Sequence, residues 1–273
     1  MLGAIAGDII GSYYEHSRFK FYDFKLFQTR SKFTDDTVMT IAVARWLVEY
    51  EDEGHPKDKL IGLMQELGRE YPRAGYGYRF NKWLNSDNPQ PYNSWGNGAA
   101  MRVSPVGLYA KTLDIALDLA KRTAEVSHSH PEGIKGAQAV ASAVWMAKHG
   151  HSKEEIRVYI TDKFGYDLTR TVDEIRPDYM WEISSQCSVP ESIICFLEGK
   201  DFEDVVRLAV SLGGDADTMA CIAGSIASCI YPIPKEIEDE CKKILPSLLH
   251  NYMQMFEGYI EYGREFNQLL DLL

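Results

Sequence analysis

Apolar positions along this chain recur mostly at intervals of three and four residues, the spacing that gives an α-helix one apolar face. In segment 34–51, for example, Val38, Ile41, Ala42 and Leu47 fall at this spacing. Alternating, strand-like runs are few. The pattern predicts helices over segments 3–14, 34–51, 56–69, 80–84, 97–109, 113–126, 131–148, 152–164, 190–197, 202–212, 215–231 and 234–256. The sequence therefore favours an all-α fold.

Two segments interrupt the helical pattern. Residues 71–94 are rich in Gly, Pro, Asn and Tyr, and residues 170–179 are rich in charge, so both are expected to be loops. Loops this long inside a compact domain usually serve function. No Gly/Ser-rich linker and no repeat divides the chain. We expect one domain over residues 1–273, with a site lined by helix N-termini and the loops between them.

Composition narrows the classes of function. The chain is 45% hydrophobic and 25% charged, values typical of a soluble globular protein, and no apolar run is long enough to cross a membrane. The formal net charge of −11 repels a nucleic-acid backbone. Five cysteines without a Cys-x-x-Cys pair, and an N-terminus without a basic leader segment, predict a cytoplasmic protein with reduced thiols.

Two short acidic segments, 33–37 and 213–218, carry the strongest chemical signal. Each places two carboxylates and a hydroxyl directly before a predicted helix. Ordinary N-capping would explain either segment alone. Neighbouring carboxylates repel each other, however, and hard oxygen ligands favour Mg²⁺, Mn²⁺ or Ca²⁺ over Zn²⁺. The same chemistry at both ends of the chain favours a two-metal site with these candidate ligands: Thr34, Asp35, Asp36, Asp215, Asp217 and Thr218.

Three further segments contain candidate site residues. Gly7 and Gly11 indicate tight helix packing, while Glu15, just beyond them, could swing over a pocket. Segment 94–102 is a loop-to-helix junction that would let a phosphate or ribose approach the backbone, although a simple Asn-Gly turn is the alternative. In segment 127–131, hydrogen bonding or helix capping by the two histidines is favoured over zinc binding, because no third soft ligand lies nearby.

Taken in order, these motifs resemble those of the ADP-ribosylglycohydrolase family. The matching segments are Gly7–Glu15, Thr34–Thr37, Gly96–Arg102, Ser127–Pro131 and Gly213–Thr218. The resemblance implies an all-α orthogonal bundle with two Mg²⁺ or Mn²⁺ ions in a central cleft, held by the six candidate ligands. It also implies that Glu15 lies on a mobile flap over the metals. The resemblance places the following residues along a groove for ADP-ribose: Gly96, Asn97, Gly98, Met101, Ser127 and His130.

The same resemblance implies hydrolysis at C1″ of the distal ribose of an ADP-ribosyl group, with Glu15 or Asp36 as the general base. A non-catalytic ADP-ribose-binding module and a hydrolase of O-acetyl-ADP-ribose or another nucleotide ester are the alternatives. Segment 72–77 contains no acid, whereas the family's arginine-specific bacterial enzyme has a catalytic Asp there. The leaving group therefore stays open between arginine, serine, an acetyl ester and others.

Overall fold

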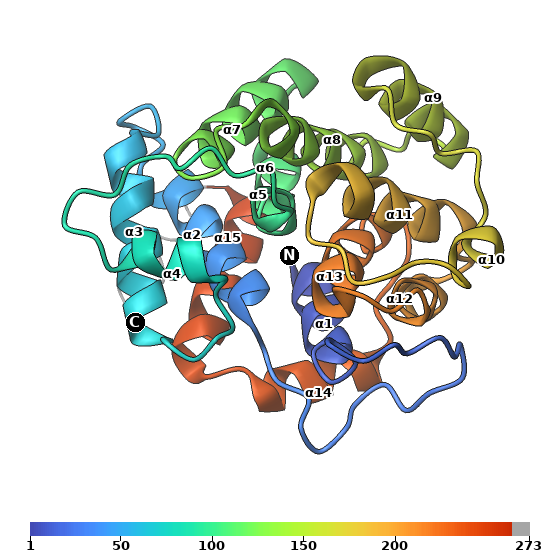
Figure 1. Cartoon of the computed structure of the whole chain (residues 1–273). Coiled ribbons are helices and arrows are strands. Elements are labelled where there is room, and N and C mark those ends of the chain that lie inside the picture. Colours follow the sequence, from blue (N-terminus) through green and yellow to red (C-terminus); the bar gives the residue numbers. More distant parts are fainter. Residues whose placement is uncertain (264–273) are drawn as a thin grey trace.

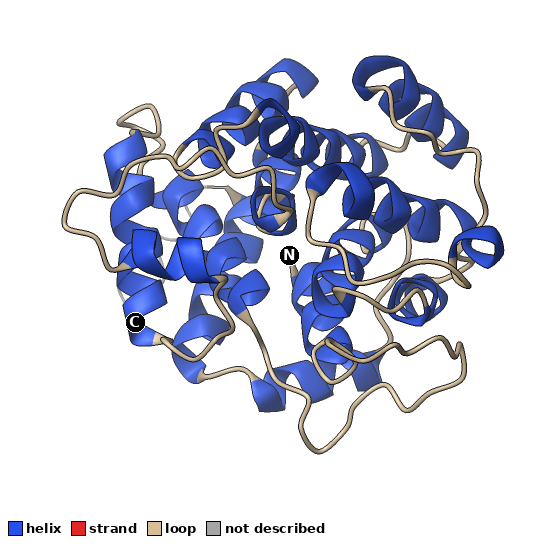
Figure 2. Ribbon diagram, in the orientation of Figure 1, coloured by secondary structure: helices blue, strands red, loops and turns tan. Residues whose placement is uncertain are grey.

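The computed structural model describes residues 1–263, and every regular element in that part of the chain is a helix (Figures 1 and 2). The helices are α1 Leu2–Gly11, α2 Asp35–Glu49, α3 Lys57–Glu70, α4 Tyr78–Leu84, α5 Gly98–Met101, α6 Ser104–Tyr109, α7 Leu113–Glu125, α8 Pro131–Lys148, α9 Lys153–Phe164, α10 Val172–Ile175, α11 Ser185–Glu198, α12 Phe202–Ser211, α13 Ala216–Ala227, α14 Lys235–Ile244 and α15 Ser247–Tyr262. The predicted all-α, single-domain fold is confirmed; the last ten residues of the predicted domain, 264–273, lie outside the described part.

Helices α1 and α13, from opposite ends of the chain, lie side by side in the interior (Figure 1). They touch along a row of glycines in α1. A Cβ atom on Gly7 would lie 2.0 Å from the carbonyl oxygen of Ala220, and one on Gly11 would lie 2.5 Å from that of Ala216. Only glycine fits a backbone approach this close. The tight packing predicted at Gly7 and Gly11 is confirmed, and it brings the first helix beside the second acidic segment.

Two predicted helices are each broken into two, so those predictions were wrong. Segment 97–109 forms α5 and α6, and segment 234–256 forms α14 and α15. Both breaks come just before a proline, Pro105 or Pro246. Proline has no N–H for the helical ladder, and its ring clashes with the carbonyl four residues earlier, which ends a helix. Leu245, before Pro246, is accordingly extended, with ψ of 130°.

Two other segments contain more helix than predicted. Helix α11 begins at Ser185 and not at Pro190, so Pro190 lies inside the helix, in its second turn, where it costs one backbone hydrogen bond. Segment 170–179, expected to be a loop, contains the short helix α10, which begins with a capping box between Thr171 and Glu174. No described helix has the combination of length and apolar composition that crossing a bilayer requires.

Candidate metal centre and substrate groove

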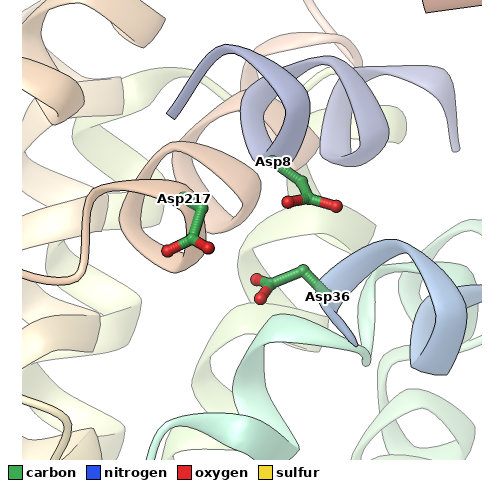
Figure 3. A group of neighbouring side chains, drawn as sticks. All are labelled: Asp8, Asp36 and Asp217. Carbon is green, nitrogen blue, oxygen red and sulfur yellow. The ribbon is translucent and has the colours of Figure 1, made fainter. Parts of the chain in front are cut away.

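The site lies where α1 meets the first turns of α2 and α13. Asp8 from α1, Asp36 from α2 and Asp217 from α13 point toward one another (Figure 3). Each offers a carboxylate oxygen within 4.8 Å of the others, and all three side chains are buried. Glu15, Asp215 and Asp217 form a second group, whose carboxylate oxygens also lie within 4.8 Å of one another. Asp217 belongs to both groups, so the two form one continuous acidic centre.

Asp8 fastens the first turn of α2 to α1. Its Oδ2 accepts hydrogen bonds from the backbone N–H groups of Thr34, at 2.9 Å, and Thr37, at 3.1 Å, and from the Thr37 hydroxyl. Its Oδ1 accepts from the Thr34 hydroxyl at 2.7 Å. Burial raises the pKa of Asp8 to about 6, although these donors oppose the rise. The sequence analysis did not select Asp8. The available signal was an acid inside the otherwise apolar helix 2–11.

Asp36 joins the two acidic segments. Its Oδ2 accepts a hydrogen bond from the Thr218 hydroxyl at 3.1 Å, across from the second segment. Its buried Oδ1 has no hydrogen-bond partner among the described residues. Burial, and then the nearby charges of Asp8, Asp35 and Asp215, hold the pKa of Asp36 well above its ordinary value. An unpartnered buried carboxylate oxygen is costly unless a proton or a cation meets it.

The remaining predicted ligands surround this pair. Asp35 is half-buried beside Gly75, and burial followed by Asp8 and Asp215 raises its pKa to about 8. Asp35 is in neither carboxylate group, so its predicted ligand role stays a prediction. Burial raises the pKa of Asp215 to about 6, while a hydrogen bond from Asn97 opposes the rise. Burial, followed by the charge of Asp215, raises the pKa of Asp217 well above its ordinary value.

Among residues 1–263, the one basic side chain ion-paired with the centre is His16, on Glu15. Among the ion pairs of residues 1–263, none joins a Lys or Arg to Asp8, Asp35, Asp36, Asp215 or Asp217. The donor atoms present are carboxylate and hydroxyl oxygens, without sulfur or imidazole nitrogen in either group. Such a set fits Mg²⁺, Mn²⁺ or Ca²⁺ and not a zinc site. The uncompensated charge and the free Asp36 oxygen both fit a bound divalent cation.

Glu15 lies in the turn after α1, with 24% of its side chain exposed. Its Oε1 is 3.3 Å from His16 Nε2, and the His16 ring lies against Trp181 with centroids 4.7 Å apart. Further along the same segment, Lys20 Nζ donates to the backbone carbonyls of Tyr179, at 2.6 Å, and Leu212, at 2.5 Å. The segment that carries Glu15 is therefore joined to the loops around the second acidic segment.

The glycine-rich junction 96–101 borders the acidic centre. Asn97 Nδ2 donates to Asp215 Oδ2 at 2.7 Å, and the Asn97 backbone N–H donates to the carbonyl of Ile183 at 2.8 Å. Gly96 forms an isolated antiparallel bridge with Ser184. Met101 is buried beside Thr218, whose hydroxyl lies 3.8 Å from the Met101 sulfur. Asn97 thus joins the predicted ADP-ribose groove directly to a carboxylate of the acidic centre.

The two remaining groove candidates lie in the connection between α7 and α8. Ser127 is fully buried, and its Oγ accepts from Arg102 Nη2 at 2.9 Å. His130 is the N-cap of α8, and its Nδ1 accepts from the backbone N–H of Glu132 at 3.1 Å. The capping role considered for the histidines is confirmed at His130. The part that Ser127 and His130 play in substrate binding stays a prediction.

The sequence profile of the ADP-ribosylglycohydrolase family matches residues 1–261, so this chain belongs to that family. Among named relatives, ADP-ribosylhydrolase ARH3 of Homo sapiens is 27% identical over an alignment covering 93% of this chain and 92% of its own length. ADP-ribosylarginine hydrolase Tri1 of Pseudomonas putida is 23% identical, over 70% of this chain and 52% of its own.

An uncharacterized protein of Archaeoglobus fulgidus is 38% identical, but the alignment spans only 47% of either chain. A solved structure, described as an ADP-ribosylglycohydrolase-related protein complex, superposes with a TM-score of 0.72 at 24% identity. The superposition covers 96% of this chain and 95% of the other. At that identity the likeness establishes the fold.

Proposed function

We propose that this protein is a metal-dependent hydrolase that cleaves the C1″ ribosyl bond of ADP-ribosylated proteins or small conjugates and releases ADP-ribose. The family, and relatives named ADP-ribosylhydrolase and ADP-ribosylarginine hydrolase, support the class of reaction. The observation that carries the proposal is the continuous acidic centre, in which two carboxylate groups share Asp217 beside the Gly96–Met101 junction.

The ligands proposed for two Mg²⁺ or Mn²⁺ ions are Thr34, Asp35, Asp36, Asp215, Asp217 and Thr218. Bound there, the ions would supply electrostatic stabilisation and a more acidic water. Asp8 is proposed to act behind these ligands, because its four hydrogen bonds fix Thr34 and the first turn of α2. An outer residue of this kind sets the orientation of the ligands that it holds.

For the general base, Glu15 and Asp36 are the two candidates. Glu15 is partly exposed and lies in a turn, so it can reach a water at the mouth of the site. Asp36 is buried and already shares its Oδ2 with Thr218. We favour Glu15 for proton removal and Asp36 for ion binding. Hydrolysis of a ribosyl bond passes through an oxocarbenium-like state whose positive charge nearby carboxylates stabilise.

The substrate is proposed to lie along Gly96, Asn97, Gly98 and Met101, with Ser127 and His130 toward its diphosphate or ribose. Small residues at the junction leave room for a ligand to approach the backbone. Free cysteines fit the expected cytoplasmic setting. All six proposed metal ligands are present, so the enzyme is favoured over a non-catalytic ADP-ribose-binding module.

The test is release of free ADP-ribose from ADP-ribosyl-arginine, ADP-ribosyl-serine and O-acetyl-ADP-ribose, each with Mg²⁺, with Mn²⁺ and with EDTA. We expect metal-dependent release from at least one, which also identifies the leaving group. Asp217→Asn should abolish this release. The control, Asp118→Asn, changes a surface carboxylate on α7 and should leave the release unchanged. Tight ADP-ribose binding without release from any substrate would refute the enzyme and support a binding module.

A further inference from the structure

Arg102 is a buried cation that the proposed reaction leaves unused. It lies just after α5, is fully buried, and forms no ion pair with a carboxylate among the described residues. Its guanidinium lies 5.7 Å from the centre of the Phe80 ring, and its Nη2 donates to the Thr123 carbonyl at 2.8 Å and to Ser127 Oγ at 2.9 Å. Burying an unpaired charge is expensive, so the position calls for an explanation.

Ser127 links Arg102 to the imidazole of His128 through hydrogen bonds. The guanidinium has only donors, so Ser127 Oγ must accept from it. The serine hydroxyl hydrogen then needs an acceptor, and among the described residues its one remaining partner is His128 Nδ1, at 2.8 Å. The arrangement that satisfies this hydrogen has Nδ1 accepting it, which in a neutral imidazole places the ring proton on Nε2.

His128 presents that Nε2 edge to the glycine-rich junction. The side chain is 6% exposed, and Nε2 has no hydrogen-bond partner among the described residues. A Cβ atom on Gly98 would lie 2.9 Å from Nε2, so the absence of a side chain there makes the room into which the ring points. The rings of Tyr92, at 5.8 Å, and Phe80, at 6.3 Å between centroids, border the imidazole.

We propose that Arg102, acting through Ser127, is a positioning residue that locks His128 as the neutral Nε2–H tautomer, which donates to an anionic oxygen of the ligand held at Gly96–Gly98. The identity of that ligand, the diphosphate of ADP-ribose, rests on the proposed function. Burial, and then the positive charges of Arg102 and Arg79, lower the pKa of His128 well below its ordinary value, so the ring stays neutral at physiological pH. A donor of fixed direction discriminates better than a freely titrating one.

The first test needs no ligand, and its only variant, His128→Gln, serves to assign a signal. Long-range ¹H–¹⁵N correlation of the imidazoles in ¹⁵N-histidine-labelled protein distinguishes the two tautomers and the imidazolium. Seven histidines give seven patterns, and His128→Gln identifies the one that belongs to His128. We expect the Nε2–H tautomer throughout pH 5.5 to 8. An Nδ1–H tautomer or an imidazolium in that range would overturn the proposal, whatever the protein's activity.

The second test is ADP-ribose affinity by calorimetry. His128→Phe should weaken binding by about 10- to 100-fold, the loss of one hydrogen bond to a charged group. Arg102→Met should weaken it less, by about two- to fivefold, because part of the His128 population keeps the donating tautomer. His128→Gln should stay within about threefold of wild type, because its amide N–H supplies the same donor. The matched control is His149→Gln, exposed at the far end of α8, which should bind as wild type does.

The outcomes separate this inference from the proposed function. If wild-type protein does not bind ADP-ribose, the proposed function is contradicted. The tautomer measurement still tests whether Arg102 and Ser127 fix the tautomer of His128. Wild-type binding that Arg102→Met and His128→Phe leave unchanged refutes the lock alone. Equal losses in His128→Gln and His128→Phe also refute it, because a donor at Nε2 would then be irrelevant. Arg102→Met should in addition give a mixture of His128 tautomers, an effect that a purely structural role would not produce.

Discussion

Asp8 should make the metal-free protein less stable as the pH rises, and Asp8→Asn should remove that dependence. The variant suits the site. The amide oxygen can take the place of Oδ2, which accepts from Thr34 N–H, Thr37 N–H and the Thr37 hydroxyl. The amide nitrogen then faces the Thr34 hydroxyl, which can accept as well as donate and can turn its proton toward Asp36. The first turn of α2 therefore stays attached to α1.

The magnitude follows from the pKa of Asp8, about 6 when folded against an ordinary value of 3.8. Below pH 3.8 both states carry the proton, and the contribution of Asp8 to pH dependence is absent. Between pH 3.8 and 6 the unfolded chain ionises first, so the free energy of unfolding falls as pH rises. Above pH 6 the full penalty is present, about 3 kcal/mol at 1.36 kcal/mol for each unit of pKa difference.

The assay is urea unfolding in EDTA from pH 4 to pH 7.5, for wild type and Asp8→Asn. The difference in free energy of unfolding should move by about 3 kcal/mol in favour of the variant as pH rises through this window. In Tm the same change amounts to about 6–12 °C for a chain of this size. The control is Asp118→Asn, whose side chain is 65% exposed and whose curve should run parallel to wild type. If the free energy of unfolding of Asp8→Asn also runs parallel to that of wild type across this pH range, the reasoning is refuted.

Three further changes test other parts of the structure. Asp217→Asn should lower ADP-ribose release by at least about 100-fold in saturating Mg²⁺. Because Asp217 belongs to both carboxylate groups, the variant should also lose bound metal from both, as measured by elemental analysis. Retention of one tightly bound ion would contradict this. Gly7→Ala should cost about 3 kcal/mol or prevent folding, since its Cβ would meet the Ala220 carbonyl, whereas Gly62→Ala, in open space on α3, should stabilise by about 0.5–1 kcal/mol in urea unfolding. Lys20→Met should lower stability by about 1–2 kcal/mol and speed amide hydrogen exchange across residues 16–33, and unchanged exchange there would argue against Lys20 as the fastening.

Local pattern predicted most of the helices because each depends on residues a few positions apart. The helix predicted over segment 152–164, for example, is α9, which begins with a capping box between Ser152 and Glu155. The errors came where one residue competes with the periodicity around it. Pro105 and Pro246 stand in otherwise helical sequence, and both end a helix there, while Pro190 does not. The difference depends on where the proline falls within its helix and on tertiary packing, which apolar spacing does not encode.

The site could be predicted from the sequence only where residues next to one another in the chain supply its chemical groups. The clusters around Asp36 and Asp217 each stand out in the sequence, and the Thr218 hydroxyl on Asp36 joins them. Asp8 did not stand out, because its role depends on the contact between α1 and the start of α2. The pairing of Arg102 with Ser127 depends likewise on how α5 meets the end of α7. Contacts between distant segments are set by packing, which a single sequence does not specify.

The glycine contact between α1 and α13 also determines when the site can form during synthesis. Asp8 and Asp217 lie roughly 200 residues apart in the chain, so the ribosome makes the first many seconds before the second, roughly 10–40 s at usual elongation rates. Until α13 has emerged, the glycine face of α1 has no partner and the first acidic segment lacks the second. The divalent metal proposed for this site could therefore stabilise only a nearly finished chain, and a nascent or truncated polypeptide ending before residue 215 would gain none of that stabilisation.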